Sequence, residues 1–281
     1  MLGLKAKHVS DHFSVSPTAQ LVDNFDRSIV SKTEHRPWPM PTAPWLMTQT
    51  WHNLLFAHWR VDVAALRKIV PTAFELDLFN NEAWLGVVPF YMTNVGMRGT
   101  PSLPWLSAFP ELNVRTYVRI EDRPGVYFFS LDAARGLAVA AARTLLNLPY
   151  FRASMTVDSG REGVVYHSAR RGRRPAVFRA EYSANGPPFN AARGSLEHFL
   201  AERYCLYHQT RRGTPYRLEI HHPPWPLQAA RAEIQVNTMA SASGIQVDDA
   251  PPLLHFARRL DVIAWTPTYL RDRRSVRNVT E

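Results

Sequence analysis

Five polar side chains occupy alternate positions in the segment ELNVRTYVRI, residues 111–120. Alternation with period two places Glu111, Asn113, Arg115, Tyr117 and Arg119 on one face of a strand and the intervening, mostly apolar residues on the other. Such a row could line a polar pocket, in which a carboxyl group transfers protons and a guanidinium holds an anion. The same pattern is typical of an antiparallel strand with one face on the core and one in water, so the segment alone leaves both interpretations open.

Residues 46–61 also alternate, and they bring further polar groups to one face. Even-numbered positions include His52, His58 and Arg60, whereas tryptophans occupy the odd-numbered face. We therefore predict a long strand whose polar face contains two histidines and an arginine. A histidine among aromatic residues is commonly a half-buried structural group, so composition alone assigns neither histidine a role.

Three helices are expected beside these strands. Asp62 is a suitable N-cap for a short helix at residues 63–70, which Pro71 ends. Asp132 is expected to cap the segment AARGLAVAAARTLL, the strongest helix-forming segment of the chain, and Ser195 to cap SLEHFLAERY.

Short alternating or apolar segments predict the remaining strands. They lie at residues 83–95, 125–131, 151–159, 163–171, 176–184, 204–209, 216–222 and 260–265. About ten strands with three or four helices favour an α+β protein with a closed or strongly curved antiparallel β-barrel core and peripheral helices.

The charge of the chain does not favour nucleic-acid binding. Its formal net charge is +9, but the 33 Lys and Arg residues, of which only four are lysines, are scattered along the sequence. Binding to nucleic acid needs a localised basic patch. The densest run, RRGRRP at residues 170–175, is interpreted as a solvated turn between two strands.

Compartment and cofactors follow from what the sequence lacks. Cys205 is the single cysteine, so an internal disulfide is excluded, and no Cys/His set has zinc-site spacing. We expect neither a metal nor another cofactor. No segment resembles a signal peptide or a membrane span, so a cytoplasmic protein without a membrane partner is expected. Residues 1–44 are interpreted as a poorly ordered lead-in, 45–268 as the domain and 269–281 as a polar tail.

A family resemblance covers the chain from Trp38 to Trp265. The segments that carry it are PWLMTQTWHNLLFAHWRV, PELNVRTYV, GVYFFSLDA, LPYFRASM, FLAERYCLY, HHPPWPL and LLHFARRLDVIAW. They resemble the YqjF-like group of uncharacterised bacterial proteins, which is similar to a branch of the acetoacetate decarboxylase-like superfamily. The resemblance implies a β-barrel-like core with an active-site cavity inside and helices outside.

The resemblance also implies a rewritten site. Enzymes of that superfamily use a Schiff-base lysine just after a proline, and here Tyr150 follows Pro149, with Phe151 in the place of the neighbour that lowers the lysine pKa. A phenol cannot form an imine, so a Schiff-base decarboxylase is not expected. Glu111 resembles the superfamily's active-site glutamate, whereas His52 replaces an arginine and Gly86 a second glutamate.

Two function classes remain open. The first is an enzyme of lyase or isomerase type, acting on a small carbonyl or carboxylate compound. It would use Glu111, Tyr150 and His52 as catalytic groups, and the substrate-binding residues would be Asn113, Arg115, His58, Arg60 and Arg203. The second is a non-catalytic protein that binds a small molecule in a decarboxylase-like cavity. The expected partner is a small-molecule ligand in either class, and a homo-oligomer stays open.

Overall fold

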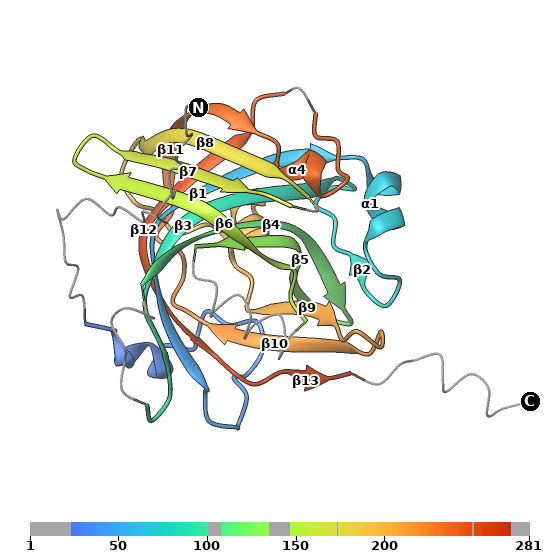
Figure 1. Ribbon diagram of the computed structural model, residues 1–281. Helices are drawn as coiled ribbons and strands as arrows, with labels where there is room; N and C mark the ends of the chain where they lie inside the picture. Colours follow the sequence, from blue (N-terminus) through green and yellow to red (C-terminus); the bar gives the residue numbers. More distant parts are fainter. Residues whose placement is uncertain (1–23, 101–107, 135–146, 173, 249, 271–281) are drawn as a thin grey trace, which may run out of the picture.

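The computed structural model describes residues 24–100, 108–134, 147–172, 174–248 and 250–270. In these residues, thirteen strands form one hydrogen-bonded sheet (Figure 1). The strands are β1 (Met47–Val61), β2 (Glu75–Leu76), β3 (Ala83–Met97), β4 (Phe109–Ile120), β5 (Arg123–Ala133), β6 (Tyr150–Ser159), β7 (Val164–Arg170), β8 (Ala176–Ala184), β9 (Cys205–Gln209), β10 (Pro215–His221), β11 (Gln228–Asn237), β12 (Leu253–Ala264) and β13 (Thr268–Tyr269). The described helical segments are the 3₁₀ helix η1 (Arg27–Ser31) and the α-helices α1 (Val63–Ile69), α3 (Leu196–Ala201) and α4 (Met239–Ala242).

The sheet closes on itself, which confirms the predicted β-barrel. Nine strands form the main ring, in the order β5–β6–β7–β8–β11–β12–β1–β3–β4. A second ring shares the wall β12–β1–β3–β4–β5 and is completed by β9 and β10. Most pairs are antiparallel as predicted, but β5 pairs in parallel with both β6 and β9. The shared wall therefore has two buried faces.

Two apolar clusters fill the spaces on either side of the shared wall. Inside the nine-strand ring, Leu55 of β1 and Val114 of β4 pack with Tyr166 of β7. On the opposite face, Phe56 of β1 packs with Trp225, which follows β10. The side chains of the adjacent residues Leu55 and Phe56 therefore point to opposite faces of the wall and pack in different clusters, as the alternation of a strand requires.

The helix caps show which local predictions held. Asp62 accepts a hydrogen bond from the Ala65 amide at 2.7 Å and begins α1, and Ser195 accepts from the His198 amide at 3.2 Å and begins α3. The helix predicted to follow Asp132 falls mainly on residues outside the described ranges. Asp132 itself is part of β5 and is bonded to a buried arginine, so the capping role predicted for it is wrong.

A β-bulge in β1 corrects the predicted polar face. Asn53 has φ +50°, and the register against β3 shifts by one residue between the His52–Tyr91 and Ala57–Val87 pairs. The bulge reverses the alternation, so Trp51 packs in the same cluster as Phe56. The prediction that His52 and His58 share one face is therefore wrong.

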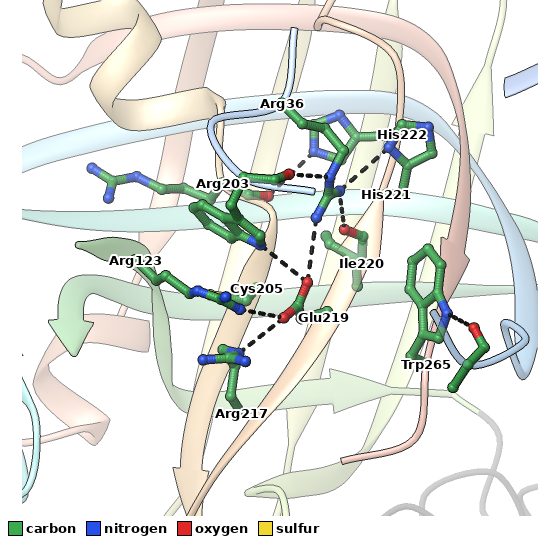
Figure 2. Close-up of polar contacts among 12 residues, drawn as sticks. Arg36, Arg123, Arg203, Cys205, Arg217, Glu219, Ile220, His221, His222 and Trp265 are labelled. Carbon is green, nitrogen blue, oxygen red and sulfur yellow. Dashed lines mark hydrogen bonds and ion pairs between the residues drawn. The ribbon is translucent and has the colours of Figure 1, made fainter. Parts of the chain in front are cut away.

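Residues 24–46, placed mostly in the lead-in by the sequence, pack against the ends of β10 and β12. Ile29 is buried beside Ile263, and the Arg36 side chain is 1% exposed. At the polar centre of this contact, the carboxylate of Glu219 accepts from the side chains of Arg36, Arg123 and Arg217 (Figure 2). It also accepts from the Trp38 indole. Buried charges require such partners, so this cluster ties the segment to β10.

Candidate functional site

Glu111 and Tyr150 meet on the face of the shared wall that looks toward β10 and Trp225. Glu111 lies on β4 and is 4% exposed, and the Tyr150 hydroxyl donates to its Oε2 at 2.9 Å. Antiparallel pairing sets Glu111 opposite Ala133 of β5, and parallel pairing sets Leu131 of β5 opposite Tyr150. The expectation that these two side chains face the same place is confirmed.

Burial shifts the proton affinity of both groups. Burial raises the pKa of Glu111 to about 8; the hydrogen bond from Tyr150 lowers it and the nearby Asp132 raises it further. The pKa of Tyr150 is raised well above its usual value, first by burial and then by the charge of Glu111. Tyr150 therefore remains a hydrogen-bond donor, while Glu111 exchanges a proton near neutral pH.

Asn113 and Arg115 continue the polar row on β4. Both are at least nine-tenths buried. Arg115 donates through one terminal nitrogen to the Leu200 carbonyl at 3.1 Å, and its guanidinium lies over the Phe56 ring. Within the described structure, Asn113 Oδ1 and Arg115 Nε have no hydrogen-bond partner. Buried polar atoms of this kind need a ligand or water to satisfy them.

His58 is the third polar group with a free atom on this face. The Tyr117 hydroxyl donates to the Leu200 carbonyl at 2.8 Å, so its oxygen must accept from His58 Nε2, which lies 2.7 Å away. This fixes the proton on Nε2 and leaves Nδ1 as an acceptor, for which the described residues provide no donor. Burial, Arg115 and His255 hold the His58 pKa well below its usual value, so the ring is neutral.

Gly86 allows the His58 ring to lie against β3. A Cβ atom at Gly86 would come within 3.1 Å of His58 Cδ2 and Nε2 and 3.5 Å of Arg115 Cγ. Contacts at 3.1 Å would push the ring away from its position. Gly86 thus makes room for a histidine from the neighbouring strand.

Two predicted site residues, His52 and Arg60, lie away from Glu111. His52 is on the opposite face of β1, bonded to Thr93 Oγ1 at 2.7 Å. Arg60 is at the exposed end of β1 and pairs with Glu82 at 3.0 Å. The structure does not bring either residue to Glu111.

Arg203 packs against Tyr117, the residue that is hydrogen-bonded to His58. Its guanidinium pairs with Asp77 and lies over the rings of Tyr117 and Phe199, 4.9 and 4.3 Å from their centroids. Its Nε donates to the Phe199 carbonyl and its Nη1 to Asp77, so two of its three nitrogens are engaged by protein atoms. Arg203 therefore holds Tyr117 in place, which differs from the predicted contact with substrate.

A second buried polar cluster escaped the sequence analysis. Arg170, interpreted as part of a solvated turn, is 2% exposed and donates to Asp132 Oδ1 at 3.0 Å inside the nine-strand ring. The interpretation is wrong for this residue. Alternation could have found it, because Tyr166, Ser168 and Arg170 occupy successive inward positions of β7. Tyr166 also reaches the site, since its hydroxyl donates to the backbone carbonyl of Glu111 at 2.8 Å.

The lysines of the described segments lie away from Glu111. Lys32 pairs with Asp26 on the surface, and Lys68 is exposed on α1. Among the same residues, no three His, Cys, Asp or Glu side chains are grouped closely enough to hold a metal ion. The side chains present around Glu111 can transfer protons and form hydrogen bonds.

The chain matches a family of uncharacterised proteins over most of its length. Residues 48–261 match the DUF2071 family, described as an uncharacterised conserved protein. The chain is 48% identical to YqjF of Bacillus subtilis (strain 168) over 226 residues, which are 80% of this chain and 93% of that protein.

Solved structures with the same fold are enzymes. The enduracididine biosynthesis enzyme MppR, complexed with pyruvate, aligns with a TM-score of 0.59 and 12% identity, covering 84% of this chain and 94% of MppR. Acetoacetate decarboxylase from Legionella pneumophila aligns with a TM-score of 0.56 and 14% identity, covering 87% of this chain and 96% of the decarboxylase.

No helix in the described ranges has the length and apolar character needed to cross a membrane.

Proposed function

Because the chain belongs to the DUF2071 family and has the fold of the acetoacetate decarboxylase-like enzymes, we propose that it is a small-molecule enzyme of lyase or isomerase type. Its substrate is a small carbonyl or carboxylate compound. The observation that carries the proposal is the hydrogen bond of 2.9 Å between Tyr150 and a buried Glu111 whose pKa is about 8. A carboxyl group that titrates near neutral pH is suited to general acid/base catalysis.

Each group on this face has a distinct role in the proposal. Glu111 removes a proton from carbon or oxygen, or returns one, and Tyr150 orients its carboxyl group. Arg115 Nε donates to a substrate carboxylate or to a developing oxyanion. His58 Nδ1 accepts a hydrogen bond from a substrate hydroxyl, and Asn113 completes the polar lining.

The proposed chemistry needs no Schiff base. Tyr150 occupies the position after Pro149 at which the resemblance places the nucleophilic lysine, and it bonds to Glu111 directly. Imine formation requires an amine, whereas enolisation, dehydration or aldol-type cleavage requires an acid and a base. Borohydride reduction in the presence of acetoacetate should therefore leave no adduct on any lysine. Specific trapping on Lys68 would overturn this part of the proposal.

Ligand discovery and isotope exchange test the proposal. Small carboxylates and ketones are screened for an increase in the melting temperature, since a ligand that binds the folded state stabilises it by mass action. Each binder is then incubated with the protein in D₂O, and deuterium incorporation is followed by NMR. Wild-type protein should exchange a carbon-bound proton or convert the binder, and Glu111→Gln should bind it without exchange.

Two controls separate catalysis from binding. Glu75→Gln removes an exposed carboxylate on β2 and should retain the wild-type rate. If a binder neither exchanges a proton nor reacts with the wild-type protein, the proposed enzymatic activity is contradicted, and the result supports a non-catalytic binding protein.

A further inference from the structure

A surface pocket opens on the opposite face of the wall, where His52 is placed. Its volume is about 720 Å³, and it lies between the β6–β7 turn, the end of β8, the middle of β12 and the bulge of β1. The left-handed Asn53 turns His52 toward this pocket, and the bond to Thr93 holds the imidazole in the wall. A hollow of this size is typical of small-molecule sites.

The charges that line the pocket are mainly positive. Four guanidinium groups, from Arg161, Arg231, Arg258 and Arg259, face a single carboxylate, that of Glu162. Two of the arginines are anchored: Arg231 Nε donates to Ser183 at 2.8 Å, and Arg259 pairs with Asp261 at 3.0 Å. Such anchoring orients a guanidinium in advance for a second partner.

Arg161 and Arg258 carry the charge that remains uncompensated. Both are exposed, and neither forms an ion pair or hydrogen bond with any residue in the described part of the chain. They approach the pocket from different elements, the β6–β7 turn and β12. Two free guanidinium groups at one concave site raise the local concentration of anions.

The neighbouring surface limits the size of the anion. An adjoining hollow shares the β6–β7 turn, Arg161 and Arg231 with this pocket, but it also contains the carboxylates of Asp158, Glu181 and Glu233. Arg258 belongs to the proposed pocket and does not line the adjoining hollow. A long polyanion that crossed both hollows would meet these like charges, whereas a compact group at the β1–β12 end would not. This arrangement favours a small ligand over nucleic acid.

We propose that this pocket binds a phosphate or diphosphate ester of a small molecule, with Arg161, Arg231 and Arg258 holding the phosphate oxygens. Guanidinium groups match phosphate geometry and remain charged at all physiological pH values. The site lies across the wall from Glu111 and is independent of the chemistry proposed there.

Pyrophosphate is the probe, and calorimetric titration at constant ionic strength is the measurement. Wild-type protein should show saturable binding, and the double variant Arg161→Gln/Arg258→Gln should bind about tenfold or more weakly. The matched control is Arg211→Gln/Arg212→Gln, which removes two exposed charges from the β9–β10 turn and should change the affinity by less than about twofold. Glu111→Gln should bind pyrophosphate as the wild type does.

Three results would overturn the proposal. The first is an absence of saturable binding to wild-type protein at probe concentrations up to about 10 mM. A dissociation constant above this concentration would be too weak for a specific site. The second is an equal loss of affinity in the pocket variant and the matched control, since that would reflect net charge alone. The third is binding of a long single-stranded oligonucleotide without binding of pyrophosphate. NMR of the His52 ring provides an independent readout, because a bound anion in the pocket should shift its signals in Glu111→Gln as in wild type.

Discussion

The hydroxyl of Tyr150 and the carboxylate of Glu111 are joined across an intervening strand. Glu111 is on β4 and Tyr150 begins β6, with β5 between them, and yet their oxygens are 2.9 Å apart. The strongly curved sheet and the parallel β5–β6 pair make this contact. It gives the buried carboxyl group its one hydrogen-bond donor among the described side chains.

Glu111→Gln should stabilise the protein at alkaline pH. The carboxyl group has a pKa of about 8 in the folded state and an ordinary value in the unfolded chain, so the unfolded state loses its proton first as pH rises. Wild-type stability must therefore fall between about pH 4.5 and 8 on account of this group. The variant should be more stable than wild type by on the order of 2–4 kcal/mol at pH 9 and nearly equal at pH 4.5. The free energy of unfolding of both proteins is measured with urea over this pH range. If the variant and the wild type differ by the same amount at all pH values, the raised pKa of Glu111 is contradicted.

Tyr150→Phe should raise the Glu111 pKa further. The hydroxyl lowers this pKa by donating to the carboxylate, and the variant removes that donor. Carbon-13 NMR of the Glu111 carboxyl should report the shift, with Tyr269→Phe, an exposed tyrosine on β13, as the control. The lost hydrogen bond should also cost about 1–2 kcal/mol of stability at pH 9. An unchanged or lowered pKa would show that Tyr150 does not donate to Glu111 in solution.

The His58 ring should be neutral and protonated on Nε2 at pH 7. Burial lowers its pKa, and the Tyr117 hydroxyl accepts from Nε2 because its own proton goes to Leu200. Nitrogen-15 NMR distinguishes the two tautomers directly. Tyr117→Phe removes the acceptor and should increase the population of the other tautomer. A protonated imidazolium at pH 7 in the wild type would contradict the assignment.

Asp132→Asn should be strongly destabilising at pH 8. Burial raises the Asp132 pKa to about 6 in spite of Arg170, so the pair is ionised at pH 8. The variant leaves the buried guanidinium without a counter-charge, and breaking a buried pair in this way costs about 3–5 kcal/mol. Removing the exposed Glu75–Arg119 pair by Glu75→Gln should cost no more than about 1 kcal/mol. Equal, small losses in urea unfolding would mean that Arg170 reaches water.

Mild acid should loosen the segment at residues 24–46. Burial lowers the pKa of His221 to about 4, and its ring contacts both Arg36 and the Ile29 carbonyl. A folded pKa below the usual 6.5 means that this stabilisation is complete above about pH 6.5 and is lost as pH falls through 4. Hydrogen exchange of the Ile29 region should therefore accelerate at pH 4 more than exchange in β4, after correction for intrinsic rates. Parallel changes in both regions would contradict a local effect.

The sequence predicts the polar row on β4 because its alternation is unbroken, and every member from Glu111 to Tyr117 is buried on one face. It does not predict the face of His52, because one asparagine in a left-handed conformation reverses the alternation without any change in hydrophobic pattern. The strand β11 was also missed. Its half-buried positions include Ala230 and Ala232, which are small and lack strand propensity.

The shared wall makes the two compartments interdependent. Tyr166, from the core of the nine-strand ring, donates to the backbone carbonyl of Glu111, the residue whose side chain faces the other way. A substitution that repacks the nine-strand core can therefore tilt the site backbone without touching a site side chain. Variants designed around Glu111 should therefore keep the packing of the nine-strand core unchanged, because that core also positions the backbone of Glu111.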